Sequence, residues 1–191
     1  MKNHRTSDHL LTLKAVVNKY VTIGKNKLYA CFIDFKKAFH SVWHKGIFEC
    51  IEKIGFSGKQ LQLIKDIYKK TKCAVKFDNK ITDFFNFTKG VRQGCPLSPI
   101  LFNIYVNEIF QLVNENNSPD INLGEGNKVN ALMYADDLIL LSETREGLQN
   151  QIDKVNNFCL ERKLKINAKK TKVMDRGNKM VKANLYCFND F

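Results

Sequence analysis

The stretch Asn130-Ala131-Leu132-Met133-Tyr134-Ala135-Asp136-Asp137-Leu138-Ile139-Leu140-Leu141 places two adjacent carboxylates inside an apolar segment. It predicts two short strands joined by a tight turn, with Asp136 and Asp137 at the tip. Burial beside a second carboxylate disfavours ionisation of either acid. Divalent cations bind carboxylate oxygens and cancel this repulsion, so the pattern suits a metal site. A solvated hairpin turn explains it equally well, because Asp tolerates turn geometry.

A second acidic candidate follows the apolar, β-prone run Leu28-Tyr29-Ala30-Cys31-Phe32-Ile33, which ends at Asp34. Two-metal chemistry needs a carboxylate from a separate strand, so that the ions are held from both sides. Asp is also a favoured N-cap residue, and Asp34 could cap a helix expected over residues 35–43. The two roles are compatible. Phe39, within that helix, is typical of a core residue.

A third segment, Gly90-Val91-Arg92-Gln93-Gly94-Cys95-Pro96-Leu97-Ser98-Pro99, combines glycines and prolines ahead of an expected helix over residues 100–116. Glycine lets the backbone approach a ligand closely. Ser98 and Pro99 predict the N-cap and the first helical position. Arg92 and Gln93 lie in the loop, where polar side chains could meet a substrate. Taken alone, the segment is a glycine- and proline-rich helix start.

The composition indicates a basic globular chain of one domain. Its 31 Lys and Arg residues outnumber 19 Asp and Glu residues, which gives a net charge of +12 over 191 residues. This balance favours polyanions such as nucleic acids as partners. The six cysteines form no Cys-x-x-Cys pair and no Cys/His cluster, so a zinc site is not expected. Scattered cysteines are typical of a reducing intracellular compartment. No signal peptide or membrane-spanning run is found, so no membrane partner is expected, and nucleus and cytoplasm both fit.

The remaining periodicity predicts an α+β fold, an antiparallel sheet backed by helices on one face. Polar residues 114–128 are expected to form a loop. Three helices should bury an apolar face. The residues are Leu10, Leu11, Leu13, Val16 and Val17 in the first helix, Leu101, Ile104, Tyr105, Ile109, Leu112 and Val113 in the helix over 100–116, and Leu148, Ile152, Val155, Phe158 and Cys159 in the helix over 147–163. The other expected elements are helices over 6–20, 44–54 and 147–163, a helix capped by Ser57, strands over 73–77, 84–87, 164–166 and 171–174, and a hairpin turn over 78–80.

Taken in chain order, these segments resemble the reverse transcriptase domain of non-long-terminal-repeat retrotransposons, the jockey-like group in particular. Four ordered motifs are more specific than any single one. The resemblance implies a polymerase palm with partial fingers over residues 1–191, with the upstream fingers and the thumb missing. The matching segments are Arg5–Asp8 (last fingers motif), Ala30–Phe39, Gly90–Pro99 and Tyr134–Asp137 (palm motifs one to three), and Leu164–Asn167 with Lys170–Lys172 (motif four).

The resemblance implies an RNA-directed DNA polymerase, a nucleotidyltransferase that adds dNTPs to a primer 3′-hydroxyl by a two-metal mechanism. Asp34, Asp136 and Asp137 would hold two Mg²⁺ ions, with Mn²⁺ as an alternative. Lys170 would give a proton to the leaving pyrophosphate, with three neighbouring lysines as competitors. Phe39 would exclude the 2′-hydroxyl of a ribonucleotide. The implied substrate-binding residues are Phe35, Phe39, Gln93, Gly94 and Tyr134.

The implied partners are an RNA template, a DNA primer, dNTPs and the rest of a retrotransposon polyprotein. His40 departs from the family pattern, which usually has an aspartate after the Ala-Phe pair of the first motif. Two other hypotheses are a catalytically inactive remnant that retains nucleic-acid binding, and a maturase-like RNA-binding cofactor. The intact aspartates favour the polymerase, and the missing fingers and thumb favour the remnant. The maturase would need a Gln-Gly-Gly loop, where this chain has Gln93-Gly94-Cys95.

Overall fold

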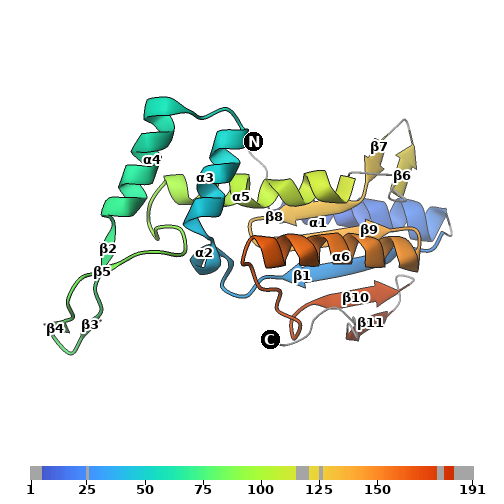
Figure 1. The fold of residues 1–191 in the computed structure, drawn as a ribbon. Coiled ribbons are helices and arrows are strands. Elements are labelled where there is room, and N and C mark those ends of the chain that lie inside the picture. Colours follow the sequence, from blue (N-terminus) through green and yellow to red (C-terminus); the bar gives the residue numbers. More distant parts are fainter. Residues whose placement is uncertain (1–5, 25, 115–120, 125–126, 176–178, 183–191) are drawn as a thin grey trace. The chain divides into compact units, whose positions relative to one another are not determined.

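The chain forms two compact units in a computed structural model that describes residues 6–24, 26–114, 121–124, 127–175 and 179–182. The sheet unit comprises Met1–Lys36 and Glu108–Phe191, and the insert unit comprises Lys37–Asn107. Figure 1 gives the order of the elements along the chain. None of the helices within the described residues combines the length and hydrophobicity needed to cross a membrane.

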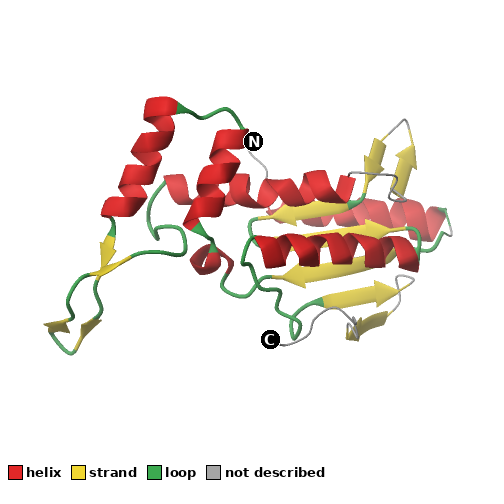
Figure 2. Ribbon diagram, in the orientation of Figure 1, coloured by secondary structure: helices red, strands yellow, loops and turns green. Residues whose placement is uncertain are grey.

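The sheet unit is built on a five-stranded antiparallel sheet in the order β11-β10-β1-β9-β8 (Figure 2). β1 is the central strand and pairs with β9 on one side and β10 on the other. The predicted α+β class with an antiparallel sheet is therefore confirmed. The strands are β1 (Tyr29–Asp34), β8 (Ala131–Tyr134), β9 (Asp137–Ser142), β10 (Lys172–Asp175) and β11 (Lys179–Lys182).

Helices cover both faces of this sheet, whereas the sequence predicted cover on one face. Ala30 and Leu141 are paired across β1 and β9, and both pack with Val16 of α1 in one buried cluster. Cys31 and Leu140 form the next pair, which lies on the opposite face because strand side chains alternate. Helix α6 packs across β1 and β9. The helical segments are α1 (Thr6–Val17), the π-helical η1 (Asn18–Ile23) and α6 (Arg145–Glu161).

The first helix has a narrower apolar face than predicted. Leu10 and Leu11 are 61% and 67% exposed, whereas Leu13 and Val17 pack against the cluster around Val16. The helix predicted over residues 6–20 is α-helical only to Val17, and the backbone continues as the π-helical segment η1 to Ile23. Arg5 of the fingers motif lies outside the described residues.

The region predicted as a loop over residues 114–128 contains a hairpin. β6 (Ile121–Gly124) pairs with β7 (Asn127–Val129), while residues 115–120 and 125–126 lie outside the described part. Ile121 is fully buried, and Leu123 packs against the same core cluster. The two apolar residues stand among polar ones, so the sequence gives little signal for a strand. Packing of Ile121 and Leu123 against the core cluster stabilises the hairpin.

The long helix predicted over residues 147–163 is confirmed as α6. The Thr144 hydroxyl accepts a hydrogen bond from the Gly147 amide (3.0 Å), which caps the helix. All five side chains predicted to face inward are buried, namely Leu148, Ile152, Val155, Phe158 and Cys159.

Arg162, just after α6, forms a largely buried ion pair with Glu108. Arg162→Met should lower the free energy of unfolding by about 3 kcal/mol, because it leaves the Glu108 carboxylate without its charged partner. Urea unfolding measures this change. The double variant Arg162→Met/Glu108→Leu should recover much of the loss. A single-variant loss below about 0.5 kcal/mol, typical of an exposed pair, would contradict this expectation.

The insert unit carries helices α2 (Ala38–Ser41), α3 (His44–Lys53), α4 (Gly58–Lys70) and the first part of α5 (Leu97–Asn114). The helices predicted from residue 44 and after Ser57 are confirmed. The strands predicted on either side of residues 78–80 appear as two short antiparallel ladders. These ladders are β2 (Lys72–Cys73) with β5 (Phe85–Asn86), and β3 (Lys76–Phe77) with β4 (Lys80–Ile81).

The helix predicted over residues 35–43 is much shorter, since α2 covers only Ala38–Ser41. Lys37 occupies the N-cap position with φ of +49°. The prediction that Asp34 caps this helix is therefore wrong. Asp34 ends β1, and Phe35 extends the pairing by an antiparallel bridge to the segment after α6. Long-range strand pairing overrides the local helix preference here.

Helix α5 begins at Leu97, so the predicted N-cap at Ser98 is wrong. The Ser98 hydroxyl donates to the Arg92 carbonyl (2.5 Å), and its amide donates to the Cys95 carbonyl (3.0 Å). The serine therefore closes the preceding loop from inside the first turn of the helix. The predicted apolar spacing along α5 is confirmed. Leu101, Tyr105, Ile109 and Val113 are buried, and Ile104 and Leu112 are half-buried.

Candidate functional site

Two acidic residues meet at one end of the central strands. Asp34, the last residue of β1, lies directly opposite Asp137, the first residue of β9. Asp136 lies directly before it, as the second residue of the two-residue turn between β8 and β9. The other turn residue, Ala135, has φ of +53°, which non-glycine residues adopt rarely. The hairpin predicted around the paired acids is confirmed, and sheet pairing brings the third acid to the same end.

The three carboxylates share one electrostatic environment. The pKa of Asp137 is raised above its ordinary value by partial desolvation and by the charges of Asp136 and Asp34, and Lys170 partly offsets this. Oxygen donors that repel one another in this way are the type that a hard divalent cation binds. As the side chains stand, no three His, Cys, Asp or Glu residues of the described segments lie close enough to share one ion.

Asp34 is held by the segment that follows α6. Nδ2 of Asn167 donates to Oδ2 of Asp34 (2.9 Å), and the Asn167 amide donates to the Asp34 carbonyl (2.8 Å). Nζ of Lys170 lies 3.8 Å from Oδ1 of the same carboxylate. The Asp34 amide donates a longer hydrogen bond to Oγ1 of Thr171 (3.4 Å). The strand end and its carboxylate are therefore oriented together.

Asn167 and Thr171 are site residues that sequence reasoning did not assign. Both lie in the segment that resembles the fourth palm motif, and their place there was the available signal. The amides of Lys170 and Thr171 donate to the Asn167 carbonyl (3.0 and 2.9 Å). This short turn explains why Lys170 and Thr171, three and four positions after Asn167, contact Asp34 together with Asn167.

The other predicted residues of the sheet unit differ in exposure. Lys170 has a largely exposed side chain beside Asp34. Tyr134, at the end of β8, is 37% exposed and is paired with Asp137 across the hairpin. Phe35 is buried, with 4% of its surface exposed. Lys170 and Tyr134 therefore present side-chain surface at this strand end, and Phe35 packs inward.

The insert unit carries the remaining predicted residues, Phe39, Gln93 and Gly94. The ring of Phe39 is half-buried and stacks on Phe102, with 4.2 Å between ring centroids. Gln93 and Gly94 are exposed in the loop before α5. Nε2 of Gln93 donates to Nε2 of His40 (3.2 Å), the residue that departs from the family pattern.

Gly90 explains how the first and second motifs meet within the insert unit. Its φ is +89°, and a Cβ there would lie 3.0 Å from the Cα and carbonyl oxygen of His40. Its amide donates to the Val42 carbonyl (2.8 Å), and the Val91 amide donates to the Phe39 carbonyl (2.8 Å). Only glycine combines this backbone conformation with such a close approach.

Residues 1–182 match the family described as "Reverse transcriptase (RNA-dependent DNA polymerase)". The chain is 34% identical over 143 residues to the Pol polyprotein of the R2 retrotransposable element of Nasonia vitripennis, and covers 14% of it with 75% of its own length. It is 30% identical over 166 residues to the RNA-directed DNA polymerase of mobile element jockey of Drosophila funebris, covering 17% of it with 83% of its own length. The chain thus spans about a sixth or less of these relatives.

Solved telomerase structures have a similar fold. Apo telomerase from Candida tropicalis, truncated from its C-terminal domain, superposes with a TM-score of 0.68 at 19% identity, over 91% of this chain and 36% of that one. Telomerase from Candida albicans, in complex with a fragment of telomeric RNA, gives 0.68 at 15% identity, over 92% and 31%. The polymerase-palm fold expected from the resemblance is confirmed.

Proposed function

Because the chain belongs to the reverse transcriptase (RNA-dependent DNA polymerase) family, we propose that it forms the palm and part of the fingers of an active retrotransposon polymerase. Its reaction would add dNTPs to a primer 3′-hydroxyl under the direction of an RNA template. One observation carries this proposal: Asp34, Asp136 and Asp137, from two strands and a turn, converge on one end of the sheet.

These three carboxylates are the proposed ligands of two Mg²⁺ ions, with Mn²⁺ as an alternative. Their oxygen donors and their mutual repulsion suit hard divalent cations. When bound, such ions activate the attacking hydroxyl and neutralise charge on the triphosphate. The protein's own contribution is to hold Asp34 through Asn167, so that one carboxylate has a defined orientation before the ions bind.

Other residues would act on the substrates. Lys170, exposed beside Asp34, would donate a proton to the leaving pyrophosphate. Tyr134 would contact the primer end, and Phe35 would support the nucleotide site from beneath through packing. Phe39 would stand against the 2′ position of the incoming sugar. Gln93 and Gly94 would lie beside the templating base pair.

The proposed partners are an RNA template, a DNA primer, dNTPs and the remainder of a retrotransposon polyprotein. The net charge of +12 supports binding to the phosphates of a template–primer duplex. A second candidate is a domain that binds nucleic acid without catalysis. It is favoured by one observation, that the described residues contain no ready cluster of three metal-ligating side chains.

Primer extension by residues 1–191 on poly(rA)/oligo(dT) with Mg²⁺ or Mn²⁺ tests the proposal. Labelled dTTP should enter the primer, and the duplex should bind in a parallel gel-shift assay. Binding without extension, in both metals and at high protein concentration, would reject catalysis by this chain in favour of the second candidate. Extension of the oligo(dT) primer in the absence of poly(rA) would reject the assignment as a templated polymerase.

Asn167→Ala should raise the Mg²⁺ concentration needed for half-maximal extension by about tenfold, because the Asp34 carboxylate loses the amide that orients it. Mn²⁺ binding followed by electron paramagnetic resonance should weaken in parallel, which provides a readout independent of activity. Asn150→Ala, on the exposed face of α6, is the matched control. Equal metal dependence of the two variants would show that Asn167 does not position Asp34.

A further inference from the structure

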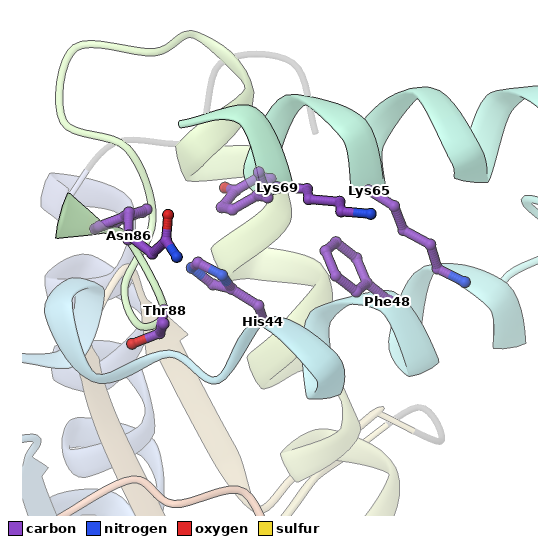
Figure 3. Close-up of a pocket in the computed structure, with 8 residues that line it drawn as sticks. His44, Phe48, Lys65, Lys69, Asn86 and Thr88 are labelled. Carbon is purple, nitrogen blue, oxygen red and sulfur yellow. The ribbon is translucent and has the colours of Figure 1, made fainter. Parts of the chain in front are cut away.

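The insert unit contains a cavity of about 440 Å³ outside the aspartate site (Figure 3). Three separate segments line it: α3 through His44 and Phe48, α4 through Tyr68 and two lysines, and the chain from β5 onward through Phe87. The volume is within the range of pockets that hold small ligands. Its lining joins aromatic rings to cationic side chains, a combination that neither the predicted site nor the proposed reaction uses.

The aromatic walls are held in place by contacts of their own. The His44 ring is edge-on to Tyr68 at 4.7 Å and tilted against Phe87 at 5.1 Å between ring centroids. Nε2 of His44 donates to the Gly90 carbonyl (2.8 Å), and burial lowers the pKa of this histidine. The hydrogen bond and the two ring contacts fix the orientation of the imidazole. It forms a fixed wall for a flat ligand.

The charged side of the cavity is basic. Nζ of Lys65 lies 5.9 Å from the centre of the Phe48 ring, and Lys69 follows one turn later on α4. Figure 3 shows both lysines extending from α4, with the Phe48 ring beside them. No acidic residue lines the cavity. The site therefore complements an anion that adjoins a planar or apolar group.

Two uncharged polar side chains complete the lining opposite α4. Asn86, whose amide is directed toward His44 in Figure 3, and Thr88 both come from the strand segment. An amide offers both a donor and an acceptor, and a hydroxyl can serve as either. Such groups match the edge of a nucleobase, which carries donors and acceptors in one plane.

We propose that this cavity binds one unpaired nucleobase of single-stranded RNA, with the adjoining phosphate on Lys65 and Lys69. The base stacks on the half-buried rings of His44, Phe48 and Phe87, which the buried Tyr68 supports from behind, and Asn86 and Thr88 contact its edge. RNA is chosen over DNA because the proposed function uses an RNA template, and to that extent this inference rests on it. The site would hold template RNA that is not yet paired, so it is a binding site and not a catalytic one.

Binding of a fluorescein-labelled oligo(U) 10-mer by the whole chain, in EDTA and without dNTPs, tests the site. Phe87→Leu keeps apolar volume but removes a stacking ring, and should weaken binding by about tenfold. Phe84→Leu is its matched control, because Phe84 is exposed in the same segment and outside the cavity. The inference is overturned if the two variants bind the RNA equally.

Lys65→Gln and Lys69→Gln should each weaken binding and reduce the slope of log affinity against log salt by about one phosphate contact. Lys59→Gln, which removes the same charge from the exposed start of α4, should change neither by as much. Photo-crosslinking from 4-thiouridine should map to peptides that contain His44, Phe48 or Phe87. Crosslinks confined to other segments would overturn the assignment even if affinity changed.

Competing ligands separate the sources of this chemistry. Oligo(dT) and UMP should compete more weakly than oligo(U). Equal competition by oligo(dT) would show that the pocket binds any single strand, and would overturn the choice of RNA. The binding assay contains no metal or dNTP, so it does not depend on catalysis. Loss of the pocket proposal in this assay is therefore distinguishable from loss of primer extension. A chain that binds oligo(U) at the pocket but cannot extend a primer would refute only the catalytic proposal.

Discussion

Asp136→Asn should reduce primer extension by at least about a hundred- to a thousandfold, with little change in affinity for the template–primer duplex. The substitution keeps the shape of the side chain but removes one of the three negative charges that would hold the ions. Most duplex contacts are to phosphates and do not depend on this residue. Single-turnover extension and fluorescence anisotropy, measured on the same preparations, give the two quantities.

Stability measurements distinguish this loss from misfolding. The pKa of Asp137 is raised by desolvation and, next, by the charge of Asp136, so removing that charge should slightly increase the melting temperature in the absence of metal. Asp83→Asn, at an exposed position of the insert unit, controls for the change in net charge and should extend primers normally. Unchanged extension by Asp136→Asn would reject the metal-ligand assignment.

Phe39→Val should improve the use of ribonucleotides relative to deoxynucleotides by about 10- to 100-fold. If the ring clashes with a 2′-hydroxyl, relief of that overpacking should return about 1–3 kcal/mol to ribonucleotide binding in the transition state. The ratio of kcat/KM for UTP and dTTP on poly(rA)/oligo(dT) measures the change. Only the UTP term should rise, because dTTP lacks the hydroxyl.

The stack between Phe39 and Phe102 requires a second variant. Valine also removes this stacking contact, which could loosen the site and lower the rate with both nucleotides. Phe39→Tyr keeps the ring and should keep the exclusion of UTP. Full exclusion by an active Phe39→Val enzyme would show that another residue selects the sugar.

Elements that depend on neighbouring residues could be predicted from the sequence. Helix α6 was predicted because apolar residues recur at helical spacing on one face, and the five expected to face inward are buried. The β8–β9 hairpin was predicted because two apolar runs flank a polar turn. The π-helical continuation after α1 and the β6–β7 hairpin were not, because their apolar residues are few and gain stability only by packing against the sheet.

The candidate site divides in the same way. The neighbours Asp136 and Asp137 could be assigned from sequence, since the adjacent carboxylates are themselves the signal. Asp34 had two open roles, and its pairing with Asp137 excludes the helix cap. The place of Asn167 in the fourth motif was a signal, but its hydrogen bond to Asp34 could not be predicted, because the two residues are 133 positions apart in the chain.

By itself, the sequence determined the family resemblance, the paired acids in their turn and the amphipathic helices, because each depends on order and spacing along the chain. The tertiary structure alone decided that Asp34 pairs with Asp137 and is held by Asn167, and that side chains from three segments line one cavity. Strand register and side-chain packing create these contacts, and both arise only when distant segments pair and exclude water from the faces between them.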